Sequence, residues 1–267
     1  MIARAVVSLV IFNSVALAGV RSGKAEVEWR GVAAQYQAGK PLQTALRLVL
    51  DEGWHTYWEN PGEGGMKISV TWKLPPGWAA GELEHPIPQR FAAGGLAGFG
   101  YKGSVVFPVA FTAPPDATGP VKLTGKVSWL ACNDESCIPG DAELALALDS
   151  GAAVPTEDTP WIHAALAHIP RSRTSDLHLV VRENSDSLLL KIQPEPGISL
   201  DLTDRAVFPA TPDCVAPSAL IEFKRVGAHW LAEVPKGEYA PTPLRELRLV
   251  FAEKAGCAPF SLTWKNP

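Results

Sequence analysis

Short runs of alternating apolar and polar residues follow one another along most of the chain. In the first half these runs are residues 44–50, 67–72, 104–111, 121–130 and 142–148. Successive side chains of a strand point to opposite faces, so a period of two predicts strands with one buried face. Glycine- and proline-rich segments such as ENPGEGG and APPDATGP separate the runs and are typical of turns. The pattern predicts an antiparallel β-sandwich over residues 19–150.

A second set of alternating runs follows residue 160: DLHLVV, SLLLKI, ALIEFK, HWLAEV, LRLVF and FSLTW. Residues 151–160 are small, acidic or proline with no apolar period, which is typical of a linker. Thr159 and Pro160 have the pattern of an N-cap and a first helical position for one short helix, WIHAALAH. The length of 267 residues also favours two domains. We therefore expect an all-β chain in which residues 161–267 form a second, smaller β-domain.

The first 18 residues have the features of a signal peptide. Arg4 is a lone basic residue ahead of the apolar stretch AVVSLVIFNSVALA, which ends in the small-x-small cleavage site Ala16-Leu17-Ala18. This apolar run is short for a membrane span. We expect cleavage after Ala18 and export, rather than a membrane anchor.

Charge and motif content exclude several classes of function. The chain has 24 Lys plus Arg, 28 Asp plus Glu and a formal net charge of −4, and loss of Arg4 makes it one unit more negative. This sign, together with the lack of a basic stripe, argues against nucleic acid as a partner. GGLAGFG (residues 94–100) is rich in glycine, but it is not set between a strand and a helix as a nucleotide-binding loop would be.

The four cysteines form two dissimilar pairs. Cys214 and Cys257 lie beside prolines in loop-like sequence, and exported thiols tend to pair, so we expect one structural disulfide between them. Cys132 and Cys137 instead follow the apolar run VSWLA and flank the polar stretch NDES. Loop closure would stabilise the fold by about 4 kcal/mol for the long loop and about 2 kcal/mol for the short one.

Three interpretations of the short loop remain open: a staple, a soft-metal clip, and a surface disulfide that opens and closes. A closed zinc site needs two further ligands, and the candidates in the same domain, His55 and His85, have no motif spacing to the cysteines. We expect no metal and no cofactor.

Three blocks of sequence carry a resemblance to a known family. They are GWHTYWENPGEGG (residues 53–65), GFGYKGSVVFPV (98–109) and VSWLACNDESCIPGD (127–141). Together, and in this order, they resemble the N-terminal periplasmic domain of the DsbD and ScsB thiol:disulfide interchange proteins; the tandem β-domains are more similar to the ScsB branch. The resemblance implies an immunoglobulin-like sandwich without a bound cofactor. Its cysteine pair would be reduced by a membrane-embedded partner and would then reduce exported thioredoxin-fold proteins.

The resemblance also implies which residues surround the pair. The family has an aromatic cap loop over the cysteines, which matches Phe99 and Tyr101 here, with Tyr57 as a neighbour. Other aromatic residues of these blocks are expected in the core: Trp54, Trp58 and Trp129.

The two cysteines are expected to have different roles. Cys137 precedes Ile138-Pro139, and the proline keeps that flank extended and short of one backbone donor, so Cys137 should be open to an incoming chain. Cys132 continues the apolar run and should be less accessible. The family resemblance agrees, and we predict that Cys137 attacks and Cys132 resolves. Asp134 and Glu135 between them disfavour a strongly acidic thiol.

The resemblance leaves the setting of the reaction open. Longer family members continue into a membrane domain and a thioredoxin-like domain, so this chain would be a free-standing shuttle served by a separate membrane-embedded thiol reductase, or a fold that has lost the relay. The acceptor could be an isomerase, a cytochrome c maturation factor or a metal-resistance protein. The alternatives from other classes are a non-catalytic periplasmic binding or assembly module with two structural disulfides, and metal delivery.

Overall fold

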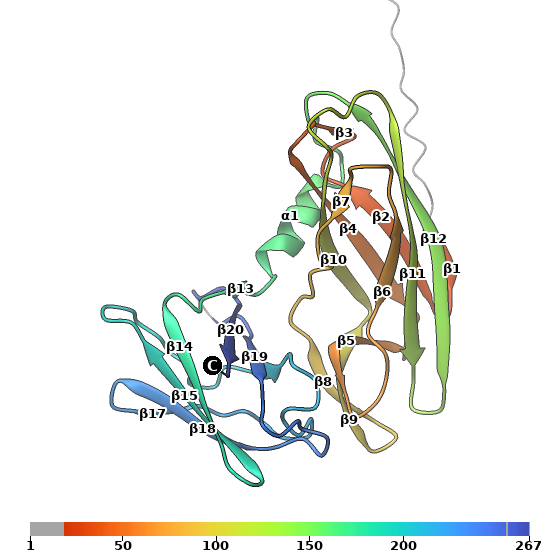
Figure 1. Cartoon of the computed structure of the whole chain (residues 1–267). Coiled ribbons are helices and arrows are strands. Elements are labelled where there is room, and N and C mark those ends of the chain that lie inside the picture. The colour runs from red at the N-terminus through yellow and green to blue at the C-terminus, as the bar shows by residue number, and fades with distance from the viewer. Residues whose placement is uncertain (1–18, 255, 267) are drawn as a thin grey trace, which may run out of the picture.

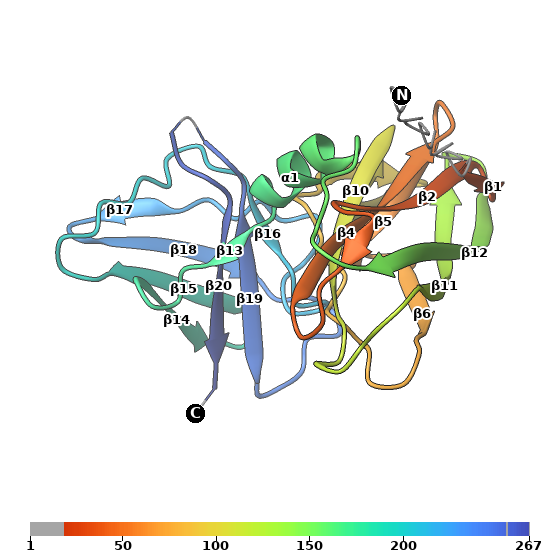
Figure 2. The same ribbon diagram turned by 90° about the horizontal axis from the view of Figure 1, so that it is seen from above.

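The computed structural model describes residues 19–254 and 256–266, which form two β-sandwiches with one short helix between them (Figure 1). The all-β fold class is confirmed. Seen from above, the two sandwiches lie side by side (Figure 2). The expected signal peptide, residues 1–18, lies outside the described residues. Within the described ranges, no helix is long and apolar enough to cross a membrane.

The first domain consists of two facing sheets. One has the strand order β1 (Val20–Ser22), β2 (Ala25–Gly31), β4 (Pro41–Leu50), β10 (Ser104–Thr112) and β7 (Ala79–Ala80). The other has the order β3 (Gln35–Tyr36), β12 (Cys137–Ser150), β11 (Val121–Cys132), β5 (His55–Gly62), β9 (Leu96–Lys102) and β8 (Gln89–Ala93), and β6 (Ser69–Lys73) also pairs with β11. The alternating runs became strands because each could place its apolar positions between the sheets.

The space between these sheets is filled mainly by aromatic and branched aliphatic side chains. The indole N–H of Trp29 donates to Thr44 Oγ1 (3.0 Å), and the Thr44 hydroxyl donates to a carbonyl of β10, so these buried polar groups are paired. Of the three tryptophans expected in the core, Trp58 and Trp129 are fully buried, and Trp54 is half-buried and packs against the core. Full burial of a side chain of this kind contributes about 2–3 kcal/mol.

The helix α1 (Thr159–Ala167) follows the linker and contacts β10. Its N-cap is Asp158, so the assignment of Thr159 as the cap is wrong by one residue. Thr159 is already helical, and its hydroxyl donates to Val32 O (2.7 Å) instead of capping the helix. The Asp158 carboxylate accepts a hydrogen bond from the indole of Trp161 (2.9 Å). The helix is thereby fastened to the first domain at its N-terminal end.

The second domain has two four-stranded sheets. The first has the order β13 (Arg171–Ser172), β20 (Phe260–Lys265), β19 (Glu246–Phe251) and β16 (Val207–Pro209). The second has the order β14 (Leu177–Glu183), β15 (Ser187–Pro194), β18 (His229–Pro235) and β17 (Lys224–Val226). Of the six predicted runs only ALIEFK is not a strand: Ile221 and Phe223 are buried in irregular backbone, because pairing with β18 begins only at Lys224.

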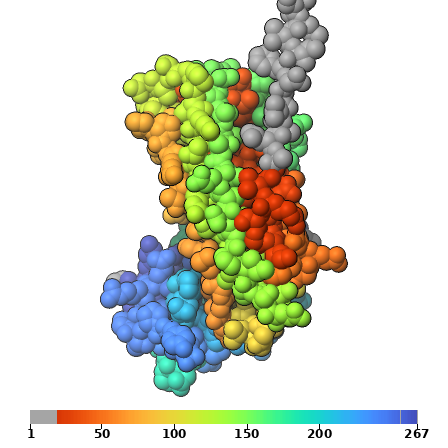
Figure 3. Space-filling model, turned by 90° about the vertical axis from the view of Figure 1, so that its right-hand side faces the viewer, coloured from red at the N-terminus to blue at the C-terminus, as the bar shows by residue number. Residues whose placement is uncertain are grey.

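The two domains meet where β5, β8 and β9 of the first face β16 and β19 of the second. Phe208 of β16 belongs to the core of the first domain rather than to that of the second. The Arg248 guanidinium donates to the Glu59 carboxylate across the junction (2.8 Å), and Asn60 donates to Pro209 O (2.8 Å). In Figure 3 the yellow segment that carries β8 and β9 lies at the lower end of the first domain, next to the blue second domain.

Candidate functional site: a hairpin disulfide beside an aromatic cluster

Cys132 and Cys137 form a disulfide at the end of the β11–β12 hairpin. Cys132 is the last residue of β11 and Cys137 the first of β12, and the two pair directly across the ladder with their Cα atoms 4.1 Å apart. Cys132 is only 1% exposed, whereas Cys137 is exposed. An incoming chain can therefore reach Cys137 while Cys132 stays covered, in agreement with the accessibilities expected from sequence.

The four-residue tip between the cysteines is organised by Asn133. The Asn133 N–H donates to Ser136 O (2.9 Å), and the Asn133 side-chain oxygen accepts from the N–H groups of Glu135 (3.0 Å) and Ser136 (2.8 Å). These bonds do not involve sulfur, so they hold the turn whether or not the disulfide is present. Asp134 and Glu135 point to solvent at the tip.

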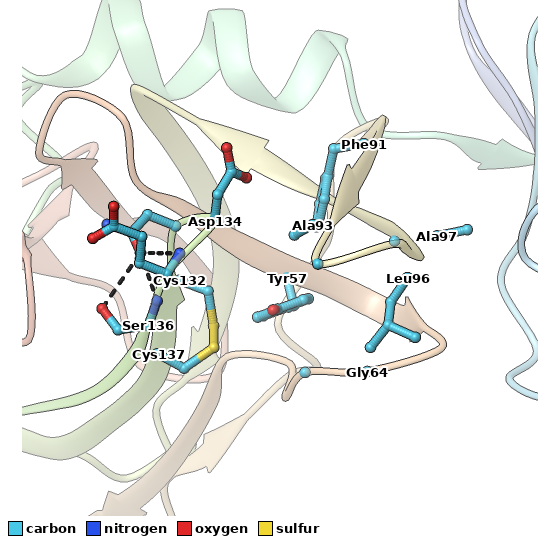
Figure 4. A pocket seen from close by; sticks show the side chains of 15 residues that line it. Tyr57, Gly64, Phe91, Ala93, Leu96, Ala97, Cys132, Asp134, Ser136 and Cys137 are labelled. Carbon is cyan, nitrogen blue, oxygen red and sulfur yellow. Dashed lines mark hydrogen bonds between the residues drawn. A yellow bond between two sulfur atoms is a disulfide. The ribbon is translucent and has the colours of Figure 1, made fainter.

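A pocket of about 350 Å³ opens beside the disulfide. The Tyr57 ring of β5 lies next to the two sulfurs, and Leu96 and Phe91 lie farther along (Figure 4). The rest of the pocket wall consists of the hairpin tip and of small residues from the β8–β9 turn and from the segment after β5. These small residues are Gly64, Gly65, Ala93, Gly94, Ala97 and Gly98. The pocket is thus lined by apolar side chains on one side and by the disulfide hairpin on the other.

Phe99 and Tyr101 do not line this pocket, and the cap assignment is corrected for both. Opposite residues of an antiparallel pair share a face, and neighbours in a strand alternate. On β9 it is Gly98 and Gly100 that face the pocket side, Gly100 opposite Tyr57, so Phe99 and Tyr101 point the other way. Both are buried, Phe99 at 0% and Tyr101 at 6% exposure. Tyr57, the third expected cap residue, does line the pocket.

Sequence reasoning missed Phe91 on β8. Its ring lies over Gly98, since a Cβ atom built there would come within 2.6 Å of it. It also packs on His55 with ring centroids 4.1 Å apart, and both contact Tyr57 at 5.8 and 5.4 Å. We call His55, Tyr57 and Phe91 the aromatic cluster. The available signal was the Gly94-Gly95 turn, because a hairpin closed there places Phe91 opposite Gly98.

His55 connects the aromatic cluster to the disulfide. It lies directly opposite Cys132 in the pairing of β5 and β11. The imidazole is 3% exposed, and its buried Nε2 has no hydrogen-bond partner. Burial lowers the pKa of His55, Lys102 opposite it on β9 lowers it further, and Asp134 of the hairpin tip opposes the change. The ring is therefore neutral near neutral pH.

The described residues contain no group of three or more His, Cys, Asp or Glu side chains that could hold a metal ion. His55 is engaged with two aromatic rings, and His85 packs against Phe107 with ring centroids 5.3 Å apart. Burial lowers the pKa of His85 to about 4, with smaller contributions from Lys67 and Arg248. Neither histidine joins the cysteines in a ligand set.

Cys214 and Cys257 are free thiols, so the expected disulfide between them is wrong. The Cys214 thiol donates to Glu246 O (3.7 Å) at the start of β19, while Cys257 follows the far end of that strand. The six residues of β19 span about 17 Å, and a disulfide needs Cα atoms within about 7 Å. Burial, with Asp213 and Glu246 nearby, raises the pKa of Cys214 to about 11.

The fold and the site together define a class of protein: a tandem β-sandwich whose first domain carries an accessible disulfide on a hairpin. Residues 26–149 match the family model of the thiol:disulfide interchange protein DsbD, N-terminal. The match spans nearly all of the first domain and agrees with the resemblance carried by the three sequence blocks.

One solved structure supports the fold of the whole chain. The crystal structure of the N-terminal periplasmic domain of ScsB from Proteus mirabilis matches with a TM-score of 0.64 and 21% identity, over 91% of this chain and 93% of that one. A sporulation control protein, Spo0M from Bacillus subtilis, has a TM-score of only 0.25 at 11% identity, over 91% of each chain, which is too low to indicate a shared fold. No curated protein matches the sequence at a significant level.

Proposed function

We propose that this is an exported thiol–disulfide exchange protein, which passes reducing equivalents through Cys132 and Cys137 to periplasmic thioredoxin-fold proteins. The observation that carries the proposal is the asymmetric disulfide, with one exposed and one buried cysteine, in a domain that matches the DsbD N-terminal family. The periplasmic ScsB domain of similar fold supports the compartment.

The exchange begins with both cysteines reduced. The exposed Cys137 thiolate attacks one sulfur of the partner disulfide, forming a mixed disulfide and displacing the other partner sulfur as a thiolate that takes up a proton. The Cys132 thiol then loses its proton and attacks Cys137, which restores the disulfide of this chain and releases the second partner thiol. Two electrons and two protons reach the partner, and a separate membrane-embedded thiol reductase supplies the next pair.

The uncharged rings and the acidic hairpin tip beside the pair suit a carrier of low reactivity. Buried apolar rings beside the disulfide and exposed Asp134 and Glu135 at the tip offer no positive charge to stabilise a thiolate. The proposal therefore assigns selectivity to docking rather than to an acidic thiol. The alternative of a binding module with two structural disulfides loses support, since Cys214 and Cys257 are not joined.

The test is a direct electron transfer. The reduced protein is mixed with an equal amount of an oxidised thioredoxin-fold protein, and both are quenched with an alkylating agent and weighed by mass spectrometry. We expect this chain to lose two alkylatable thiols, from Cys132 and Cys137, as the partner gains two. A variant with Cys214→Ser and Cys257→Ser should transfer equally well. If this chain keeps both thiols after mixing with each of several oxidised thioredoxin-fold proteins, the exchange function is contradicted.

A further inference from the structure

The β8 strand has different neighbours on its two faces. Arg90 and Phe91 are consecutive, so their side chains point to opposite faces of the sheet. Phe91 belongs to the aromatic cluster beside the disulfide. Arg90 points to the second domain, where its guanidinium donates to Pro217 O (2.9 Å) and Val207 O (3.2 Å). One short strand therefore links the disulfide site to the other domain.

The Arg90 guanidinium also lies between two aromatic rings. Its central carbon is 4.9 Å from the ring centroid of Phe99 in the first domain and 5.4 Å from that of Phe208 in the second. The rings of Phe99, Phe208 and Trp58 in turn contact one another edge to face, with centroids 6.0 to 6.2 Å apart. Cation–π contacts with desolvated rings and hydrogen bonds from a charged donor are each stronger than their exposed or neutral counterparts. Arg90 therefore binds β8 firmly to the second domain.

Within its own sheet β8 is weakly held. Among the described strands it lies at the edge of its sheet and pairs only with β9, to which it is joined by the Gly94-Gly95 turn. Both glycines have positive φ, 58° and 85°, and neither has an atom within 4 Å of the position of an added Cβ, so the turn is open to solvent. An edge hairpin of this kind is mobile unless its other side is covered. The second domain supplies that cover.

We infer that the second domain positions the aromatic cluster. It binds Arg90 on one face of β8, and this keeps Phe91, on the opposite face, packed on His55 beside Cys132. This inference deepens the proposed function and rests on it. Arg90 touches neither sulfur and is a positioning residue. Release of β8 from the second domain frees Phe91 to leave His55, and attachment holds the ring in its place at the edge of the pocket.

The test measures the rate at which a water-soluble phosphine reduces the Cys132–Cys137 disulfide in the full chain. Arg90→Met should raise this rate by about tenfold, the effect of losing interactions of this type, and Arg90→Lys should restore part of the protection. Arg171→Met is the matched control, because Arg171 also bridges the domains, but its partner, Glu84 (2.5 Å), is outside β8. It should leave the rate unchanged.

A coupling measurement separates positioning from general loosening. In a Phe91→Ala background the cluster is already open, so Arg90→Met should add less than twofold. An equal acceleration in both backgrounds, or no difference between Arg90→Met and Arg171→Met, would overturn the inference. If Arg90→Met does not fold, Phe208→Leu takes its place from the other domain with the same expected results. These rates need no protein partner, so the inference can fail while electron transfer to a thioredoxin-fold protein succeeds, and the reverse.

Discussion

His55 lies directly opposite Cys132 across the β5–β11 pairing, with the Phe91 ring packed on its imidazole at 4.1 Å. The less exposed cysteine of the pair therefore has a buried, neutral histidine as its cross-strand neighbour. A proton reaches this imidazole at normal affinity only when the aromatic ring moves away, so the protonation of His55 and the opening of the aromatic cluster are linked.

The linkage predicts that acid opens the cluster. In the closed state the pKa of His55 lies below 6.5, because of burial and Lys102, with Asp134 opposing; in the open state it returns toward that value. The open state thus binds the proton more tightly and gains population as the pH falls below 6.5. The ratio of the phosphine reduction rate of the native protein to that of His55→Gln should rise from about pH 7 to about pH 5. A ratio that stays constant with pH would remove His55 from this account.

Phe91 and Phe99 should respond differently to truncation. Phe91→Ala opens the pocket and should speed reduction of the disulfide, at a stability loss of about 1–2 kcal/mol for a half-buried ring. Phe99→Ala leaves a cavity in the core and at the domain junction and should cost about 3–5 kcal/mol. Urea unfolding and phosphine reduction measure the two effects. Protection of the disulfide that depends on Phe99 and not on Phe91 would restore the original cap assignment.

The two cysteines should trap partners unequally. With Cys132→Ala, the exposed Cys137 can still attack a partner disulfide, but no thiol remains to release it, so a mixed disulfide accumulates. With Cys137→Ala, the remaining cysteine is Cys132, a residue that is 1% exposed, and it should form no stable adduct. Non-reducing gels with an oxidised thioredoxin-fold protein show which variant is trapped. Adducts held only by Cys132 would reverse the roles.

The free thiols of the second domain should be countable. The oxidised protein, denatured and alkylated, should carry two labels, on Cys214 and Cys257. In the native protein Cys214 should react more than about tenfold more slowly than Cys257, because it is buried and its pKa is raised to about 11, which leaves little thiolate. A denatured protein with no label would show that the two cysteines are joined after all.

The strands could be predicted from sequence because every alternating run buries its apolar face, whatever its position in the chain. ALIEFK shows the limit of that argument. Ile221 and Phe223 are buried as the alternation requires, but burial of a face does not require a hydrogen-bonded neighbour, and none pairs with them.

The cysteine pair and Tyr57 were also found from sequence, because they lie within continuous blocks of the family resemblance. Phe99 and Tyr101 were misplaced since the side to which a residue points depends on the register of β8 against β9, which a motif does not specify. The separation of Cys214 from Cys257 depends on the path of β19 between them and could not be read from loop length.

The Asn133 turn has a consequence for how long a partner remains attached. Because its hydrogen bonds and the β11–β12 ladder hold the hairpin without help from sulfur, Cys132 remains beside Cys137 when both are reduced. Its effective molarity toward a mixed disulfide on Cys137 is then far above that of any free thiol in solution. Forward release of the partner is therefore a first-order step within this chain, and its rate does not depend on the concentration of thiols in solution.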